Sequence, residues 1–183
     1  MEKKLTINNL FSLKGKVVLI TGASGVLGTV YVSTLLNAGA RVIAVDKIKS
    51  NSLIDSLKND YFHSDSELVN LHCFSLDITK ENDVKVFFNQ TLRNEKWFIN
   101  GVDVLINNAS LVKQVGNSDL SEAYAIFEKQ GVKDWDPYLQ VDLIGALLMV
   151  SSVIPPMKER GSGVIINISS TYGNVAPDQR LYD

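Results

Sequence analysis

The stretch "KVVLITGASGVLGTVY" (residues 16–31) decides the fold. A run of branched apolar residues ends at Thr21, and glycines follow at positions 22, 25 and 28. A buried strand, a glycine-rich turn and a helix in this order are typical of an α/β sheet, and such turns often bind phosphate groups where the helix begins. The spacing departs from the common G-x-G-x-x-G pattern, so the kind of loop has to be settled by the rest of the chain.

The remainder of the chain alternates between short apolar runs and longer helical patterns. Nearly continuous Val, Ile and Leu predict buried parallel strands, and recurrence at helical spacing predicts crossover helices. The strands are expected at 16–21, 40–46, 68–77, 102–108 and 163–169. The helices are expected at 27–38 with a cap at Gly39, 50–59, 80–92 with Thr79 as N-cap, 121–129, and 135–160 with Pro137 in its first turn and Pro155–Pro156 limiting its end. We therefore predict a Rossmann-type, doubly wound parallel sheet with helices on both faces.

The end of the chain differs from a finished fold of this class. The fifth strand is followed by "STYGNVAPDQRLYD", with no covering helix after it. We predict that residues 1–183 form a single dinucleotide-binding domain that is truncated after the fifth strand and is incomplete at its C-terminus.

The bulk composition narrows the choice of partners. The chain has 18 Lys and Arg against 20 Asp and Glu, which gives a formal net charge of −2 and no basic field for nucleic acid. The longest apolar run, "LIGALLMV", is too short to cross a bilayer, and the first residues lack the apolar core of a signal peptide. The single cysteine has no partner for a disulfide or a metal site. We expect a cytoplasmic protein without nucleic-acid, membrane or metal partners.

Each glycine of the loop has a physical role in binding a pyrophosphate. Gly22 permits a backbone conformation that other residues avoid, Gly25 allows close approach of the phosphates, and Gly28 allows the helix to pack against the strand. The helix N-terminus contributes free N–H groups and partial positive charge. The predicted cofactor-binding residues of the loop are Gly22, Ser24, Gly25, Val26, Leu27 and Gly28.

An acidic residue at the end of the second strand indicates the type of dinucleotide. Asp46 lies 18 residues after Gly28, where a carboxylate can accept hydrogen bonds from the adenosine ribose and repel a 2′-phosphate. Lys47 and Lys49 favour the opposite choice, because either could pair with that phosphate. We expect NAD rather than NADP, and the alternative for Asp46 is a solvent-exposed strand end.

Three motifs together resemble the short-chain dehydrogenase/reductase family. "TGASGVLG", "VDVLINNAS" and "GVIINISSTYG" occur in the family's order, and the resemblance covers about residues 14–173. It implies an NAD(P)-dependent oxidoreductase that interconverts a secondary alcohol and a carbonyl, and that assembles as a homo-dimer or homo-tetramer. Lys47, beside Asp46, is also a predicted cofactor-binding residue because of its charge. The resemblance implies further cofactor contacts: Asp77 and Ile78 near the adenine, and Asn108, Ala109 and Ser110 after the fourth strand, where Ser110 replaces the family's glycine.

The resemblance also implies the catalytic positions. Ser170 matches the serine that hydrogen-bonds the substrate oxygen. Asp142, 28 residues earlier, occupies the position of an asparagine in the family's proton relay; an ionised aspartate only accepts hydrogen bonds, whereas asparagine also donates. The family's proton donor is a tyrosine followed by a lysine four residues later, and its role is to move the hydroxyl proton during hydride transfer.

Two interpretations of Tyr182 remain open. It lies 12 residues after Ser170, about one short of the family spacing, and the chain ends at Asp183. Tyr182 is either the catalytic tyrosine or part of an inserted substrate loop. The second is favoured because "YGNVAPDQRLYD" resembles a bacterial branch that modifies surface sugars and flagellin, which suggests a sugar derivative as substrate. These residues alone are expected not to turn over substrate.

Two rival functions are compatible with parts of the sequence. Asp142 and the lack of a Tyr-x-x-x-Lys sequence after Ser170 are compatible with a nucleotide-binding or regulatory module without catalysis. The glycine spacing fits the T-G-x-x-G-x-x-G loop of the sugar-nucleotide epimerases and dehydratases of the extended branch of the superfamily. The sequence "NNAS" argues against that branch, which usually differs after the fourth strand.

Overall fold

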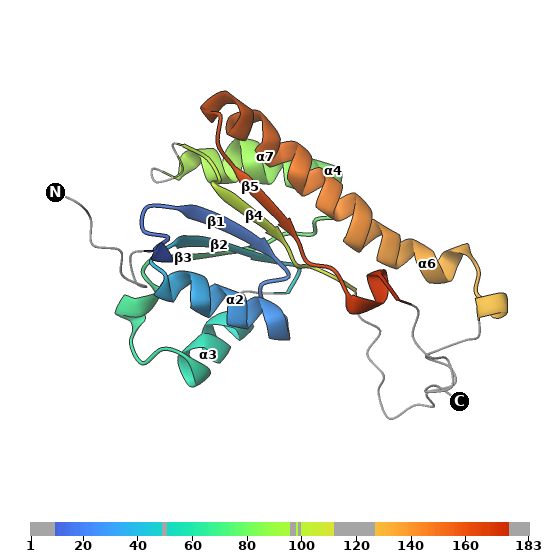
Figure 1. Ribbon diagram of the computed structural model, residues 1–183, viewed down its shortest axis with the longest axis horizontal. Coiled ribbons are helices and arrows are strands. Elements are labelled where there is room, and N and C mark those ends of the chain that lie inside the picture. Colours follow the sequence, from blue (N-terminus) through green and yellow to red (C-terminus); the bar gives the residue numbers. More distant parts are fainter. Residues whose placement is uncertain (1–9, 49–50, 96–97, 99, 112–126, 176–183) are drawn as a thin grey trace.

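The computed structural model describes residues 10–48, 51–95, 98, 100–111 and 127–175, and they form a parallel five-stranded sheet of order β3-β2-β1-β4-β5 (Figure 1). The strands are β1 (Val17–Thr21), β2 (Arg41–Asp46), β3 (Leu71–Ser75), β4 (Val104–Asn107) and β5 (Val164–Asn167). Each lies inside a predicted strand, and this confirms the predicted sheet.

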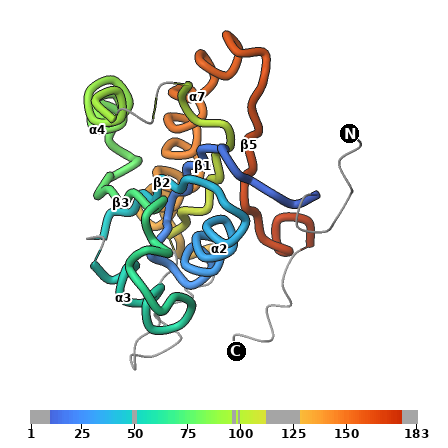
Figure 2. Tube along the Cα trace, turned by 90° about the vertical axis from the view of Figure 1, so that its left-hand side faces the viewer, coloured from blue at the N-terminus to red at the C-terminus, as the bar shows by residue number. Residues whose placement is uncertain are grey.

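Helices cover both faces of the sheet, as predicted for a doubly wound fold (Figures 1 and 2). Alternate residues of β1 point to opposite faces, and all five are buried. Val18 and Ile20 belong to the hydrophobic cluster beneath α2 (Val26–Asn37) and α3 (Asn51–Asp60). Val17 and Leu19 belong to a second cluster, beneath α4 (Glu81–Val86) and α7 (Ala146–Arg160).

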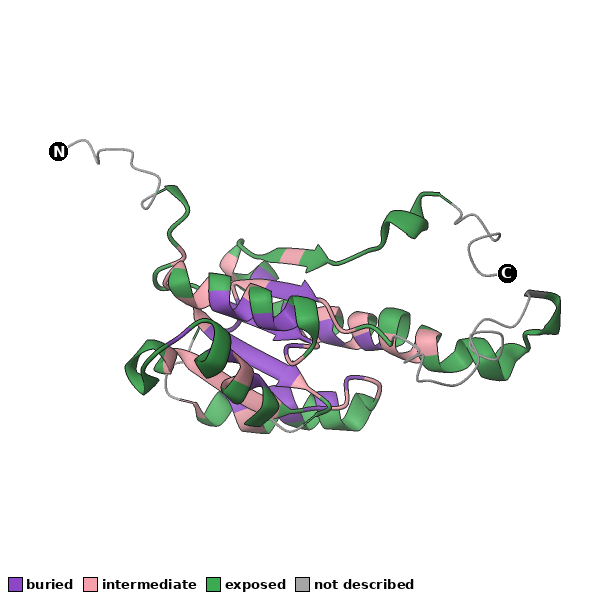
Figure 3. Ribbon diagram, turned by 90° about the horizontal axis from the view of Figure 1, so that it is seen from below, coloured by how far each residue is buried: buried purple, intermediate pink, exposed green. Residues whose placement is uncertain are grey.

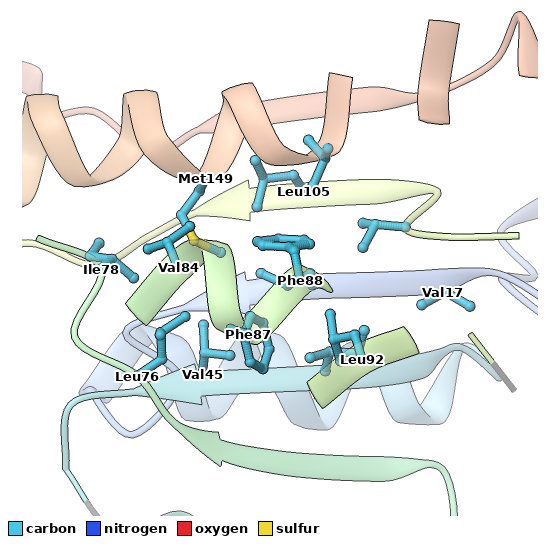
Figure 4. Close-up of a cluster of buried hydrophobic side chains, with 14 of the residues drawn as sticks. Val17, Val45, Leu76, Ile78, Val84, Phe87, Phe88, Leu92, Leu105 and Met149 are labelled. Atoms are coloured by element: carbon cyan, nitrogen blue, oxygen red, sulfur yellow. The ribbon is translucent and has the colours of Figure 1, made fainter. Parts of the chain in front are cut away.

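The second cluster, drawn in Figure 4, contains the buried side chains of two phenylalanines and two methionines. Phe87 packs edge-on against both Phe74 and Phe88, with ring centroids 5.3 Å apart in each pair. Met149 of α7 is fully buried in the same cluster. Because burial of one such side chain stabilises the fold by roughly 1.5–3 kcal/mol, this cluster fixes α4 and α7 against the sheet.

The helix that was expected at 80–92 is shorter and irregular. After α4, the chain continues in a π-helical turn (Phe87–Thr91) and a 3₁₀ turn (Leu92–Asn94). The prediction that Thr79 is its N-cap was wrong, because Lys80 holds that position. The Thr79 hydroxyl instead donates to Asp77 Oδ1 at 2.7 Å, so this side chain stabilises the turn before the helix.

The longest helical segment runs from Val132 to Arg160 as α6 (Val132–Tyr138), a π-helical segment (Leu139–Gly145) and α7. It starts before the expected Trp135, because the Gly131 amide donates to the Asp134 side chain at 2.8 Å. Pro137 therefore lies near the end of α6 rather than in a first turn. Pro155 and Pro156 lie inside α7 and do not limit it. The helix ends at Gly161, which adopts the left-handed conformation (φ 66°).

The combined helix bears on the expectation that no segment of the chain is long enough to cross a membrane. By length and composition alone, Val132–Arg160 is long and apolar enough to cross a membrane, although the run "LIGALLMV" by itself is not. A core helix of a soluble protein passes the same test. In α7, Met149, Val153 and Met157 are buried toward the sheet, which is the arrangement of a helix in an α/β layer.

The edge strand β5 is much more exposed than β1 (Figure 3). Val164 and Ile166 are 51% and 42% exposed, although their sequence is as apolar as that of β1. A 3₁₀ turn (Thr171–Gly173) follows this strand. Of the helix expected at 121–129, the described part is a 3₁₀ turn (Phe127–Lys129), and the rest lies outside the described residues.

Candidate functional site

The carboxyl ends of β1 and β4 meet where the strand order reverses, which is where open α/β sheets bind ligands. The loops that follow these strands are in direct contact. Gly22 has a φ of +64°, and a Cβ at this position would lie 2.7 Å from Ala109 Cα. Only glycine satisfies both requirements, which confirms the conformational role predicted for Gly22.

Thr21 joins the two loops through its side chain. Its Oγ1 accepts hydrogen bonds from the Asn108 amide at 3.1 Å and the Ala109 amide at 3.0 Å. The Asn108 side chain in turn donates from Nδ2 to the carbonyl oxygens of Thr21 and Gly22, both at 3.0 Å. From the sequence, Thr21 was expected only to end a strand; a threonine directly before the first glycine of the loop was the available signal.

The three glycines of the loop differ in the space around them. A Cβ at Gly28 would lie 2.2 Å from the Gly22 carbonyl oxygen, so this residue allows α2 to pack against the loop, whereas the predicted neighbour was the strand. A Cβ at Gly25 would meet only that same oxygen, at 3.4 Å. Val26 and Leu27, which begin α2, are 88% and 54% exposed. Within the described part of the chain, no acceptor is recorded for the amides of residues 26–28, which are the free N–H groups of a helix start.

Asp46 is bonded to the glycine loop rather than free in solvent. Its Oδ2 accepts from the Ser24 amide at 2.8 Å, and its Oδ1 accepts from the Ile48 amide at 3.0 Å. Each carboxylate oxygen keeps a lone pair for a further donor. The Ser24 hydroxyl oxygen is buried, and among the residues that the structure describes it has no hydrogen-bond partner.

Lys47 and Asp77 form an ion pair beside this loop. The Lys47 Nζ lies 3.3 Å from Asp77 Oδ2, and Asp77 Oδ1 accepts from the amide and hydroxyl of Thr79. Partial burial alone would raise the pKa of Asp77, but the Thr79 hydrogen bonds and Lys47 outweigh it and hold this pKa below its usual value. Ile78 is 8% exposed, and its side chain packs against Gly145.

Asp142 lies in the π-helical segment and contacts the loop after β4. Its Oδ2 accepts from the Ser110 hydroxyl and its Oδ1 from the Leu111 amide, both at 3.2 Å. Both oxygens act as acceptors, in agreement with the chemistry of a carboxylate. The structure thus brings together Ser110 and Asp142, two positions at which the sequence departs from the family pattern.

Ser170 lies beyond the carboxyl end of β5 and is exposed. Its hydroxyl oxygen accepts from the Tyr172 amide at 3.2 Å and caps the 3₁₀ turn that follows. Tyr182 lies outside the described residues. A hydrogen bond between the ends of β4 and β5 was not predicted from the sequence: Asn107 Nδ2 donates to Asn167 Oδ1 at 2.8 Å. The signal was a pair of asparagines, each near the end of a predicted strand.

Comparisons with known proteins agree with this geometry. A family model described as short chain dehydrogenase matches residues 16–182, so the chain belongs to the short-chain dehydrogenase/reductase family. A 3-oxoacyl-[acyl-carrier-protein] reductase of Thermotoga maritima is 30% identical over 173 residues, which are 93% of this chain and 62% of the relative. A D-threitol dehydrogenase of Mycolicibacterium smegmatis is 28% identical over 181 residues, which are 98% and 62% of the two chains.

A solved structure shares the fold. The short chain dehydrogenase from Leptospira borgpetersenii, determined with bound NAD⁺, superposes with a TM-score of 0.72 at 26% identity and covers 99% of this chain and 61% of its own. The chain therefore spans about three fifths of the length of these three proteins.

Proposed function

We propose that this chain provides the cofactor-binding part of an NAD-dependent oxidoreductase that interconverts a secondary alcohol and a carbonyl. The observation that carries this proposal is the loop between β1 and α2. It lies at the switch point of the sheet, and its shape requires Gly22 and Gly28. The amides of the first turn of α2 have no hydrogen-bond acceptor within the described chain.

The chemistry of these groups fits a dinucleotide. Amides at a helix start bind phosphate, and the open space at Gly25 would allow a pyrophosphate to approach the backbone. The buried Ser24 hydroxyl, which has no partner within the described part of the chain, offers one more donor in the same loop. Asn108, Ala109 and Ser110 would line the opposite side, because Ala109 is in contact with Gly22.

Asp46 supports NAD over NADP in this proposal. The Ser24 and Ile48 amides hold its carboxylate at the end of β2, where lone pairs remain for ribose hydroxyls. The same negative charge would repel a 2′-phosphate. Asp77 and the backbone at Ile78 would complete the adenosine end of the site.

Bound NAD would accept or supply the hydride, and the chain's own residues would orient the substrate and move its proton. We assign to Ser170 a hydrogen bond to the substrate oxygen and to Asp142 the role of a hydrogen-bond acceptor that orients donors such as Ser110. Tyr182 is a candidate proton donor outside the described residues. The name of the D-threitol dehydrogenase relative supports a sugar-like polyol or its derivative as the substrate class.

Calorimetric titration with NAD tests the loop assignment. In Gly25→Val, a branched side chain would enter the space above the loop, and we expect the dissociation constant to rise at least about tenfold. Gly131→Val is the matched control, since Gly131 is also a helix N-cap with an extended backbone and open space around its Cβ. The control should bind NAD as the unmodified chain does. Equal binding by both variants would refute the loop assignment.

A module that binds NAD without catalysis is the second candidate. The observation in its favour is that Asp142, which stands where the family has asparagine, accepts from Ser110 and Leu111 with both oxygens. Calorimetry and a kinetic assay on the full-length protein that contains this chain separate the two functions. NAD binding with turnover of polyols supports the oxidoreductase, and binding without turnover of any secondary alcohol or carbonyl supports the module.

The outer face of the long helix supports a homo-oligomer. Leu139, Leu143 and Leu147 are spaced by four residues and are 48%, 61% and 56% exposed. An apolar stripe of this kind typically packs against another apolar surface. Sedimentation velocity on the full-length protein tests this assignment: Leu143→Glu should convert a dimer or tetramer to a smaller species.

A further inference from the structure

We infer that Asp77 biases the chain toward NAD indirectly, by engaging Lys47, the cation that would otherwise attract the 2′-phosphate of NADP. This inference rests on the proposed NAD site and adds to it a second determinant of selectivity besides Asp46. The contact between Lys47 and Asp77 joins the segments that follow the neighbouring strands β2 and β3, and it is not evident from the sequence.

Lys47 is the cation nearest in sequence to the proposed ribose site. It follows Asp46 directly at the end of β2, and its side chain is 78% exposed. A lysine in this position pairs readily with a phosphate, because its ammonium group is a mobile point charge with three donors. An unengaged Lys47 would therefore offset part of the repulsion between Asp46 and a 2′-phosphate.

The structure engages this cation with Asp77. Their side chains lie 3.3 Å apart, and only 20% of the Asp77 side chain is exposed. The Thr79 amide and hydroxyl bind Asp77 Oδ1, so the other carboxylate oxygen, Oδ2, is directed at Lys47. The lowered pKa of Asp77 keeps this carboxylate charged at neutral pH. In addition, the Ser75 hydroxyl donates to the Lys47 carbonyl oxygen at 3.4 Å, which ties the backbone at Lys47 to β3.

The size of the effect follows from the exposure of Lys47. Exposed ion pairs are weak, so the pair biases selectivity and does not lock it. Removing the charge of Asp77 should therefore lower the ratio of the NADP to the NAD dissociation constant by roughly two- to fivefold. High salt should reduce this change, because an exposed pair is screened.

Asp83 provides a matched control for the loss of a negative charge. It lies in the first turn of α4 and lines the same hollow of about 450 Å³ as Lys47 and Asp77. Within the described residues, the ion pair recorded for Lys47 is with Asp77 and not with Asp83. Asp83→Asn thus removes an equal charge nearby without releasing Lys47.

The test is calorimetric titration of NAD and NADP into four variants and the unmodified chain. Asp77→Asn should lower the ratio of the two dissociation constants, whereas Asp83→Asn and Lys47→Met should change it less than about twofold. The double variant Asp77→Asn/Lys47→Met should return the ratio to that of Lys47→Met, and this separates release of Lys47 from direct repulsion by Asp77.

The outcomes distinguish failure of this inference from failure of the site. NAD binding with an unchanged ratio in Asp77→Asn overturns the inference alone, as does a lowered ratio that persists in the double variant. If Asp77→Asn does not fold, a Lys47→Met ratio raised more than about twofold overturns the inference, because it shows that Lys47 already attracts NADP beside an intact Asp77. Absence of NAD binding by the unmodified chain overturns the proposed function and this inference together.

Discussion

The two ends of the candidate site differ in how their polar groups are held. At the glycine loop, Thr21 is 1% exposed, and its hydroxyl accepts from two amides of the loop after β4. At the other end, Ser170 is exposed, and its hydroxyl accepts from the Tyr172 amide, two residues away. The first set of contacts joins the loops that follow two neighbouring strands, β1 and β4, whereas the second joins residues of one turn.

This difference shows which part of the site the described chain builds by itself. Contacts between residues far apart in sequence form only when the strands are in register, so the Thr21–Asn108 network is a product of the whole fold. A local cap such as that of Ser170 forms with the turn alone. We therefore expect substitutions at the glycine loop to change stability and substitutions at Ser170 to change it little.

The largest expected effect is that of Gly28→Ala. The added Cβ would lie 2.2 Å from the Gly22 carbonyl oxygen, and the nearest atoms are all backbone, which cannot turn aside. We expect a loss of about 3 kcal/mol or more in the free energy of unfolding, measured by urea denaturation. Gly25→Ala is the control, because its Cβ makes only an ordinary contact at 3.4 Å, and it should cost less than about 1 kcal/mol. Equal losses in the two variants would mean that Gly28 does not pack against the loop as described.

The next effect is that of Thr21→Val, which keeps the shape and removes the hydroxyl. The amides of Asn108 and Ala109 would lose their acceptor, and we expect a loss of about 2 kcal/mol in the free energy of unfolding. Thr21→Ser retains the oxygen and should recover about half of this loss or more. A Val variant as stable as the unmodified chain would show that the hydroxyl does not join the two loops.

The smallest expected effect is that of Ser170→Ala. The serine is exposed, and the Tyr172 amide can turn to water when the hydroxyl is removed. The free energy of unfolding, measured by thermal denaturation, should change by less than about 0.5 kcal/mol. A loss as large as that of Thr21→Val would remove the contrast between the two ends of the site.

The sequence predicted the sheet because strand and helix periods are local properties. The apolar runs that contain β1 and β4 stand out by composition, and the spacing of the glycines after Thr21 already indicates a tight turn. Right-handed crossovers restrict the possible strand orders, but the order β3-β2-β1-β4-β5 and the approach of Gly22 to Ala109 are known only from the structure.

Other features depend on tertiary contacts that no local pattern encodes. Thr79 was expected to cap a helix, but its hydroxyl is bound by Asp77, whose other oxygen pairs with Lys47. Pro155 and Pro156 were expected to limit the end of the helix at 135–160, but they lie inside α7, whose C-cap is Gly161. The bond between Asn107 and Asn167 depends on the register of β4 with β5, which the sequence does not specify.

The most direct test of the central claim is amide hydrogen exchange with and without saturating NAD. The claim is that the loop between β1 and α2 binds the cofactor's phosphates through the free amides of residues 26–28. We predict that NAD slows exchange at these three amides and at the loop of residues 108–110, with much smaller changes in α3. Slowed exchange elsewhere with none at residues 26–28 would contradict the account.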